Sequence, residues 1–521
     1  MSDVEIAQRS TRGSFALFAG NFLSTVISFV AILFIARLLG PGDYGLYTLS
    51  VLIPTILLNL LGLGVSSAIT RYAAYNISLG KPEAARRMTL NGAAFVLVSG
   101  VALAVADYLA SGFVAGSVLH RPGMVQLLQL SSTIIVAQAV FQSGSAALLG
   151  WSQMGKISTT NIVQASLRLA IVVPFLYLGY EVYGALAAYF VSVMLGGVLA
   201  FALLWRGMPG SAPSRGEFLS DVRTMLSFGR ELFVGTFVTN ISAQYIVLIL
   251  AAIATNASVG LYQSANNFAT VITLVSGAIT QALFPAFAHL GGTGSDVPRA
   301  FRYAIKYMGF AITPIIFLLM GASLQIIRLP LGSSYSTASG YLTLLALSNI
   351  AMLFGSGVLP SFFNGLGRPR YFMLYSIAGA VVVFALAPLL AISAGLGIDG
   401  LIVSIFAANL VGVIVGLYLA SRFLNAHIDL HACVSILASC LLAYAAVLAT
   451  STVHVRDVIL LPAEIIVFVG VYLTAAPLLK AVGTEDLEIL QSAVGGLGRF
   501  QVIIQPVLRY ERLVLRAIGR V

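Results

Sequence analysis

The sequence predicts an all-α polytopic membrane protein with about 14 transmembrane helices: two similar lobes of six helices, followed by two more. The first observation is composition: 59% of the 521 residues are hydrophobic and 9% are charged, against roughly 25% charged in a soluble domain. The second is that runs of about 20 apolar residues recur along the chain, each long enough to cross the hydrocarbon core as a helix. The third is an internal repeat.

We expect spans at about 14–38, 46–70, 89–112, 125–149, 157–179, 184–205, 230–254, 258–284, 303–327, 339–363, 371–394, 400–423, 432–452 and 459–480. The first thirteen residues are polar and mixed in charge. The apolar run after them is too long for the hydrophobic region of a signal peptide, so we take it as the first permanent span.

The charges between the spans predict the orientation. All but five of the 28 lysines and arginines lie in connections on the side of the N-terminus or in the tail; the exceptions are Arg37, Arg121, Arg168, Arg328 and Arg456. Because positive residues stay cytoplasmic, both termini are expected inside a plasma or inner membrane. Removing one pair of spans would preserve this alternation, so twelve spans is the alternative. The basic residues form no single patch, which argues against nucleic-acid binding.

The repeat has a shift of about 215 residues. Gly20 aligns with Gly235, Gly45-Leu46-Tyr47 with Gly260-Leu261-Tyr262, and Gly150 with Gly365. An even number of spans separates the copies, so the two lobes should cross the membrane in the same direction, as in a transporter that alternates its access.

The expected parts of the chain are an N-terminal lobe (1–205), a cytoplasmic linker (206–229), a C-terminal lobe (230–424), two additional helices (425–480) and a basic tail (481–521). In the tail, Arg509, Arg512, Arg516 and Arg520 share one helical face. This pattern is typical of an amphipathic helix that lies on the inner leaflet and is attracted to anionic lipid.

No motif indicates an enzyme, a cofactor or a metal. Gly395-x-Gly397-x-x-Gly400 matches a dinucleotide fingerprint as a string, but it lies in a short turn between spans with no strand before it. The stretch from His427 to His431 contains Asp429 and lacks further metal ligands.

Polar residues inside the spans are the better signal, because burying them without partners is costly. They fall on the equivalent first, second, seventh and eighth spans: Asn21, Thr25, Asn59, Asn240, Gln244, Gln263, Asn266, Asn267 and Thr270. For any one of them, a hydrogen bond between helices is at least as good an explanation. As a set they favour a shared polar cavity.

Two arginines are candidate contacts for an anion. Arg168 lies near the middle of the fifth span, where a guanidinium must find an anion, water or backbone carbonyls. A phosphate site and a structural partner are equally good interpretations. Arg37, at the outer end of the first span, either snorkels to the interface or meets an anionic substrate.

With these residues in view, the chain resembles the polysaccharide-biosynthesis branch, the Wzx-type oligosaccharide flippases, of the multidrug/oligosaccharidyl-lipid/polysaccharide exporter superfamily. The matching stretches are ARLLGPGDYGLYTL (36–49), VGLYQSANNF (259–268), ALFPAFAHL (282–290), LGSSYSTASGYLTLLAL (331–347), FNGLGRPRYF (363–372) and GLGIDGLIVS (395–404). The resemblance implies two six-helix lobes in a V shape around a central cavity. It also implies lipid-linked oligosaccharides on polyprenyl phosphate or pyrophosphate as substrates, with glycan polymerases or transferases as possible partners.

The hypothesis is therefore a flippase that carries such a substrate from the cytoplasmic to the outer leaflet by alternating access. One alternative is an ion-coupled multidrug efflux antiporter, although the first and seventh spans lack the mid-membrane carboxylate that such exporters usually use. A membrane-embedded glycosyltransferase or ligase would need a carboxylate or metal site facing a large soluble loop, and neither is evident. A non-transporting lipid-binding scaffold is the third alternative.

Overall fold

The computed structural model describes residues 3–206, 208, 217–293, 296–450, 455–483, 486–487, 510–512 and 514–516, with the side chains of 3–16, 18, 230–240 and 292–293 left aside. The elements in this described part are all helices, which confirms the predicted all-α class. The chain divides into two compact units, Met1–Gly260 and Leu261–Val521.

Twelve helical stretches in the described part are long and apolar enough to cross a membrane. The first, Ala19–Ser78, contains the first two expected spans, and a shorter apolar helix, Ile241–Ile253, falls in the expected seventh span. The chain is therefore a multi-pass membrane protein, and the expected count of 14 is approximate.

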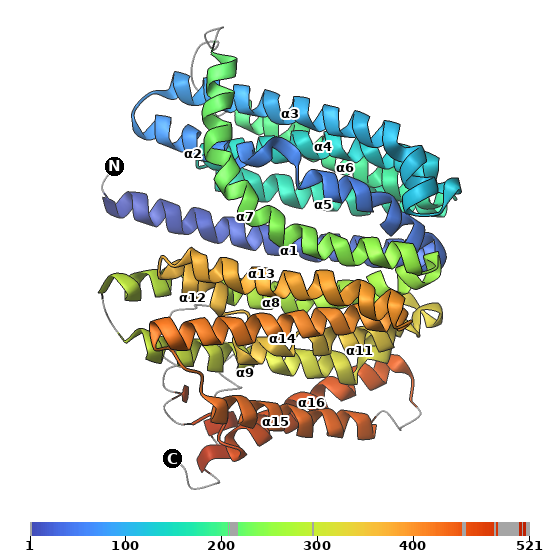
Figure 1. Ribbon diagram of the computed structural model, residues 1–521, viewed down its shortest axis with the longest axis vertical. Helices are drawn as coiled ribbons and strands as arrows, with labels where there is room; N and C mark the ends of the chain where they lie inside the picture. The colour runs from blue at the N-terminus through green and yellow to red at the C-terminus, as the bar shows by residue number, and fades with distance from the viewer. Residues whose placement is uncertain are drawn as a thin grey trace. The chain divides into compact units, whose positions relative to one another are not determined.

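The first unit is a bundle in which α3, α4, α5 and α6 lie side by side (Figure 1). Its elements are α1 (Asp3–Leu58), η1 (Leu61–Gly64), α2 (Val65–Ser78), α3 (Pro82–Phe113), η2 (Val114–Val118), η3 (Pro122–Met124), α4 (Val125–Gly150), α5 (Met154–Tyr177), α6 (Glu181–Trp205) and α7 (Phe218–Ile253).

Small residues let these helices approach closely, as is usual in membranes. A side chain at Gly196 or Gly197 of α6 would meet Phe141 of α4 within 3.1 Å. A side chain at Gly100 of α3 would meet the Ala139 methyl group at 2.5 Å. The bundle is therefore held by contacts that a larger residue would block.

The beginning of α7 is fixed to α3 by charge. Arg87 lies 2.6 Å from the Glu217 carboxylate and 3.1 Å from that of Asp221, and Asn91 donates to the same Asp221 oxygen at 2.8 Å. Asp221 is only 5% exposed. Residues 218–229, which end the expected linker, are thus the first turns of α7; residues 207 and 209–216 of that linker lie outside the described part.

The second unit consists of α8 (Asn256–Thr293, from Leu261 on), α9 (Val297–Gly321), α10 (Ser323–Leu331), η4 (Ser333–Tyr335), α11 (Ala338–Ser348), η5 (Ile350–Phe354), α12 (Leu359–Gly365), α13 (Pro369–Pro388), η6 (Leu389–Ser393), α14 (Gly397–Leu424), α15 (Leu430–Thr450) and α16 (Asp457–Leu478). Proline in the first turn of α9, α12 and α13 fits their start, because its missing N–H has no partner there in any case.

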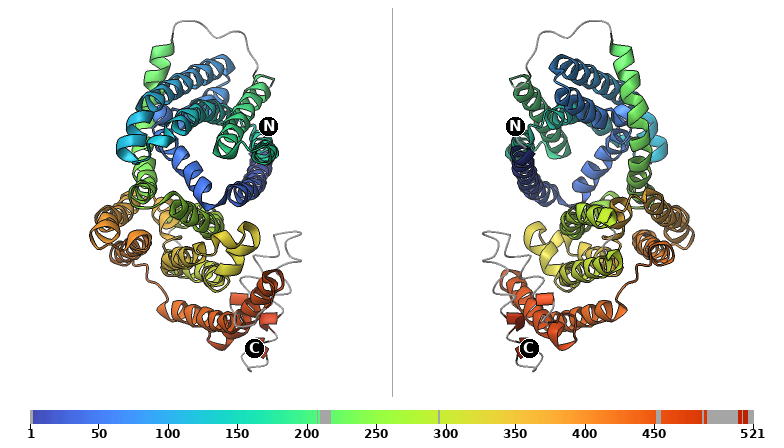
Figure 2. Two further views of the ribbon diagram at one scale, coloured as in Figure 1. Left: turned by 90° about the vertical axis from the view of Figure 1, so that its right-hand side faces the viewer. Right: turned by 90° about the vertical axis from the view of Figure 1, so that its left-hand side faces the viewer.

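The core of the second unit joins α9 to the two additional helices. Phe301, Met308 and Ile312 of α9 are buried in one apolar cluster with Ile436 of α15 and Phe468 of α16. In Figure 2, α15 and α16 are drawn in orange to red and run at an angle to the viewing direction. Both cysteines, Cys433 and Cys440, are buried in α15 and free.

Candidate functional site

The first helix is interrupted in the middle of the stretch that carries the repeat. Gly40 has φ 74° and ψ 172°, so α1 turns there before Pro41, and glycine is the residue that adopts such a φ without strain. Arg37 is exposed on the helix just before this turn. Tyr44 and Tyr47, just after it, are buried.

Arg168 lies among aromatic side chains of the first unit. Its Nη2 donates to the Tyr47 hydroxyl at 2.6 Å, and its Cζ lies 4.3 Å from the centre of the Tyr189 ring. Tyr44 stacks on Tyr47 with ring centres 6.2 Å apart, and Gln138 donates to the Tyr189 hydroxyl at 3.2 Å. We call these five residues, from α1, α4, α5 and α6, the arginine–tyrosine cluster.

The described groups that contact the Arg168 guanidinium are neutral. No carboxylate in the described part of the chain forms an ion pair with it, and its Nε is buried without a hydrogen-bond partner. A hydroxyl and a ring face stabilise a guanidinium without neutralising it. The cluster therefore gives the arginine structural partners on α1 and α6, and an anion contact at Arg168 stays a prediction.

The other candidates in the first unit form hydrogen bonds within α1 or between α1 and α5. The Asn21 carbonyl of α1 accepts from Thr25, and its side-chain oxygen accepts from Asn161 of α5 at 2.8 Å. Asn59 donates to the Thr55 carbonyl at 3.1 Å at the end of α1. The Asn21–Asn161 bond is of the kind that joins helices in membranes.

The remaining candidate residues lie on α7 and α8. Gln244 is half-buried on α7, and the side chain of Asn240 lies outside the described part. On α8, Gln263 donates to Asn267 at 3.2 Å, and Thr270 donates to the Asn266 carbonyl at 2.8 Å. A cavity shared by the first, second, seventh and eighth spans stays a prediction.

Two backbone breaks inside expected spans were not foreseen. In the second span, Gly62, Leu63 and Gly64 all have positive φ between α1 and α2. In the tenth, the helix stops at Ser348 and resumes at Leu359, with Gly355 at φ 102°. The glycine-rich strings LGLG and GSG are the signals that could have indicated them.

Backbone carbonyls at the break in the tenth span accept hydrogen bonds from side chains of distant helices. Asn409 of α14 donates to the Ser348 carbonyl at 2.9 Å, and Thr280 of α8 donates to the Gly357 carbonyl at 2.7 Å. Ser361 in turn donates to the Thr280 carbonyl at 2.5 Å. Irregular backbone at membrane depth is tolerated when protein groups bond it in this way.

At the other end of α7, one arginine caps the helix. Arg121 donates from Nη1 to the Ala251 carbonyl at 2.7 Å, from Nη2 to the Ala254 carbonyl, and from Nε to the Asn256 side chain at 2.6 Å. These carbonyls end the helix and lack partners within it. Arg121, in the connection between α3 and α4, therefore fixes the turn between α7 and α8.

The equivalent glycines of the repeat meet beside this turn. A side chain on Gly45 would overlap the Asn256 carbonyl oxygen, and one on Gly260 would overlap the Pro41 carbonyl oxygen. All these residues belong to the first unit. The repeat thus preserves glycine at two positions that require a close backbone approach.

Two acidic residues near the ends of expected spans are buried. Asp107 on α3 is 2% exposed, and Glu464 on α16 is 0% exposed with both carboxylate oxygens lacking a hydrogen-bond partner. The side chain of Glu231 lies outside the described part. At the histidine stretch, Asp429 accepts from the Ala432 amide at 3.0 Å, and no cluster of three metal-ligating residues occurs among the residues that the structure describes.

Comparison with known proteins identifies the family of this chain and proteins that share its fold. Residues 10–290 match a family model described as "Polysaccharide biosynthesis protein". The succinoglycan biosynthesis transport protein ExoT of Rhizobium meliloti (strain 1021) is 24% identical over 362 residues, which cover 68% of this chain and 69% of that protein. The lipopolysaccharide biosynthesis protein WzxC of Escherichia coli (strain K12) is 23% identical over 329 residues; the match covers 62% of this chain and 63% of WzxC, less than two thirds of its length.

Two solved structures share the fold. The lipid II flippase MurJ in an inward closed conformation superposes with a TM-score of 0.71 at 15% identity, over 90% of this chain and 98% of MurJ. An inward-facing multidrug resistance MATE family transporter of the MOP superfamily gives 0.63 at 18% identity, over 77% and 96%. At sequence identities this low, the similarity to these two structures shows a shared fold.

Proposed function

Because this chain belongs to the polysaccharide biosynthesis protein family, we propose that it is a flippase for a lipid-linked oligosaccharide. It would move a glycan on polyprenyl phosphate or pyrophosphate from the cytoplasmic to the outer leaflet of a cell membrane by alternating access. The family match over residues 10–290 is the observation that carries this proposal. The names of the two relatives and the MurJ-like fold support it.

The arginine–tyrosine cluster supports an anion contact at Arg168. The substrate's phosphate is negatively charged, and Arg168 has no carboxylate partner among the described residues. A guanidinium held in place by Tyr47 and Tyr189 loses little freedom when it binds a phosphate. Arg37, exposed on α1, is the second proposed phosphate contact.

The polar residues of α7 and α8 are the proposed sugar contacts. Gln263, Asn266 and Asn267 present amide groups within about one helical turn, and amides both donate to and accept from sugar hydroxyls. Asn240 and Gln244 on α7, and Asn21, Thr25, Asn59 and Thr270, complete the set. The polyprenyl tail would stay in the lipid while the glycan crosses.

The experiment measures the flipping of a fluorescent lipid-linked oligosaccharide by the purified protein in proteoliposomes. We expect Arg168→Gln to slow flipping at least tenfold, because a hydrogen bond to a charged group contributes about 1.5–3 kcal/mol. Arg168→Lys keeps the charge and should retain more activity. Arg422→Gln, which removes an exposed charge at the end of α14, is the matched control and should flip at the normal rate.

The outcomes separate the competing functions. Flipping that is unchanged in a folded Arg168→Gln protein would assign Arg168 a structural role and leave the flippase standing. Undecaprenyl-linked and dolichyl-linked substrates are both tested. If neither moves, export of an organic cation driven by an ion gradient would indicate the multidrug antiporter, and no transport at all would indicate a lipid-binding scaffold.

A further inference from the structure

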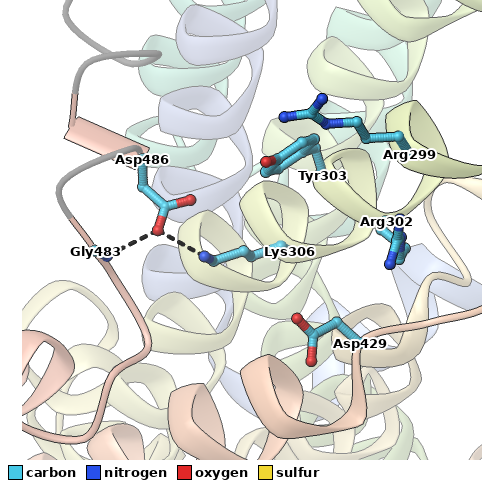
Figure 3. Close-up of a pocket in the computed structure, with 7 residues that line it drawn as sticks. All are labelled: Arg299, Arg302, Tyr303, Lys306, Asp429, Gly483 and Asp486. Atoms are coloured by element: carbon cyan, nitrogen blue, oxygen red, sulfur yellow. Dashed lines mark hydrogen bonds and ion pairs between the residues drawn. The ribbon is translucent and has the colours of Figure 1, made fainter. Parts of the chain in front are cut away.

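The second unit has a pocket of about 470 Å³ that is lined by charged residues from three segments. Arg299, Arg302 and Lys306 come from α9, Asp429 precedes α15, and Asp486 follows α16. Figure 3 shows these side chains around the pocket, with Lys306 pointing to Asp486. None of these residues belongs to the proposed substrate site.

The cationic residues lie on one face of α9. Arg299, Arg302, Tyr303 and Lys306 follow the i, i+3, i+4, i+7 pattern, so they share one face of the helix. The Arg299 guanidinium lies over the Tyr303 ring, with its Cζ 5.6 Å from the ring centre. The start of α9 therefore presents a row of three positive charges to the pocket.

The two acidic residues already have partners. Asp486 forms an ion pair with Lys306 at 2.6 Å and also accepts from the Gly483 amide at 2.8 Å and the Tyr307 hydroxyl at 3.1 Å. Asp429 caps the start of α15 through the Ala432 amide. Asp486 pairs with Lys306, and no carboxylate among the described residues forms an ion pair with the exposed Arg302.

We propose that this pocket binds a phosphate group, through Arg299 and Arg302, with Lys306 as a third cation that Asp486 occupies in this structure. A phosphate matches the fork of a guanidinium. The charge distribution predicts this connection on the cytoplasmic side, where basic pockets beside transmembrane helices bind the headgroups of anionic lipids. The phosphate could belong to such a headgroup or to free inorganic phosphate.

The experiment uses the full-length protein in a neutral detergent and three probes. These are short-chain phosphatidylglycerol, short-chain phosphatidylcholine and inorganic phosphate, each titrated by calorimetry at low and at high salt. We expect saturable binding of phosphatidylglycerol that weakens with salt, and none of phosphatidylcholine. Saturable binding of inorganic phosphate with equal affinity would also support the phosphate site and would identify the free anion as sufficient.

The variants locate the binding. Each basic residue near an anionic surface contributes about fivefold in affinity, so Arg299→Gln with Arg302→Gln should weaken binding about 25-fold at low salt. The matched control is Arg368→Gln with Arg370→Gln, an exposed pair outside the pocket, which should bind normally. Asp486→Asn frees Lys306 and should strengthen binding about fivefold.

Three results would overturn the proposal: no saturable binding of either anionic probe, equal weakening in the two arginine pairs, or weaker binding by Asp486→Asn. Each variant is first compared with the parent protein by gel filtration and by its unfolding temperature without probe. None of these measurements uses transport, so failure of the proposed flippase and failure of this pocket are distinguishable.

Discussion

At the scale of the residue, Arg168 shows how a membrane helix holds a charge. An arginine at the centre of a span must find compensation, and here it finds a hydroxyl and a ring face from two other helices. Such neutral partners fix its direction without cancelling its charge. The same residue therefore links α5 to α1 and α6, and its contact with the phosphate of a substrate stays a prediction.

A double-mutant cycle measures the first of these roles. Tyr47→Phe removes the hydroxyl that accepts from Arg168, and Arg168→Gln replaces the charged guanidinium that donates to it by a shorter neutral amide. We expect a coupling free energy of about 0.5–1.5 kcal/mol in reversible unfolding, since hydrogen bonds between membrane helices fall in this range. The pair Tyr47→Phe and Arg422→Gln should be additive, and zero coupling for Tyr47 with Arg168 would contradict the contact.

At the scale of the element, the tail differs from a helix that only lies on lipid. In the described residues, Glu511 and Leu515 are each 1% exposed, and Leu515 packs with Val482 and Leu487. Tyr510 is hydrogen-bonded to Thr474 of α16 at 2.8 Å. One side of this segment therefore docks on the protein, while Arg516 is exposed. Arg509 and Arg520 lie outside the described part, and attraction to anionic lipid stays a prediction.

The docked segment should respond to pH through Glu511. Burial, and then the nearby Asp486 carboxylate, raise its pKa from 4.5 to about 7. Between pH 4.5 and pH 7, the Glu511 carboxyl group is ionised when the segment is undocked and protonated when it is docked. Docking therefore weakens as pH rises from about 4.5 to about 7. Above pH 7 the loss is complete, and it amounts to about 3 kcal/mol at most.

A spin label attached through Arg516→Cys reports this change, because Cys433 and Cys440 are buried. The label should be more mobile at pH 8 than at pH 5. Glu511→Gln cannot ionise and should give the same mobility at both values. A pH effect of equal size in Glu511→Gln would assign the change to another group.

At the scale of the whole molecule, the alternation of basic residues along the chain predicts the topology. Arg456 and Lys480 are exposed at the two ends of α16, and the positive-inside rule places the first outside and the second in the cytoplasm. In intact cells, an impermeant maleimide should label Arg456→Cys and should label Lys480→Cys only after permeabilisation. The reverse pattern would invert the orientation and place the phosphate pocket outside.

The sequence by itself determined the fold class, the family and nearly all of the spans. Hydrocarbon accepts only backbone whose polar groups are bonded internally, so apolar runs of sufficient length must be helices. The glycines at 45 and 260 were visible as a repeat, and their shared need for close backbone approach followed only from the structure.

The tertiary structure decided which polar groups meet. Arg168 and Tyr47 are separated by 121 positions and Asn409 and Ser348 by 61, so no local pattern relates them. The carbonyls at the break in the tenth span likewise accept from residues of α14 and α8, far away in the sequence. The phosphate pocket likewise joins α9 to segments before α15 and after α16. A hydrogen bond depends on distance in space, and packing alone sets that distance between helices far apart in the chain.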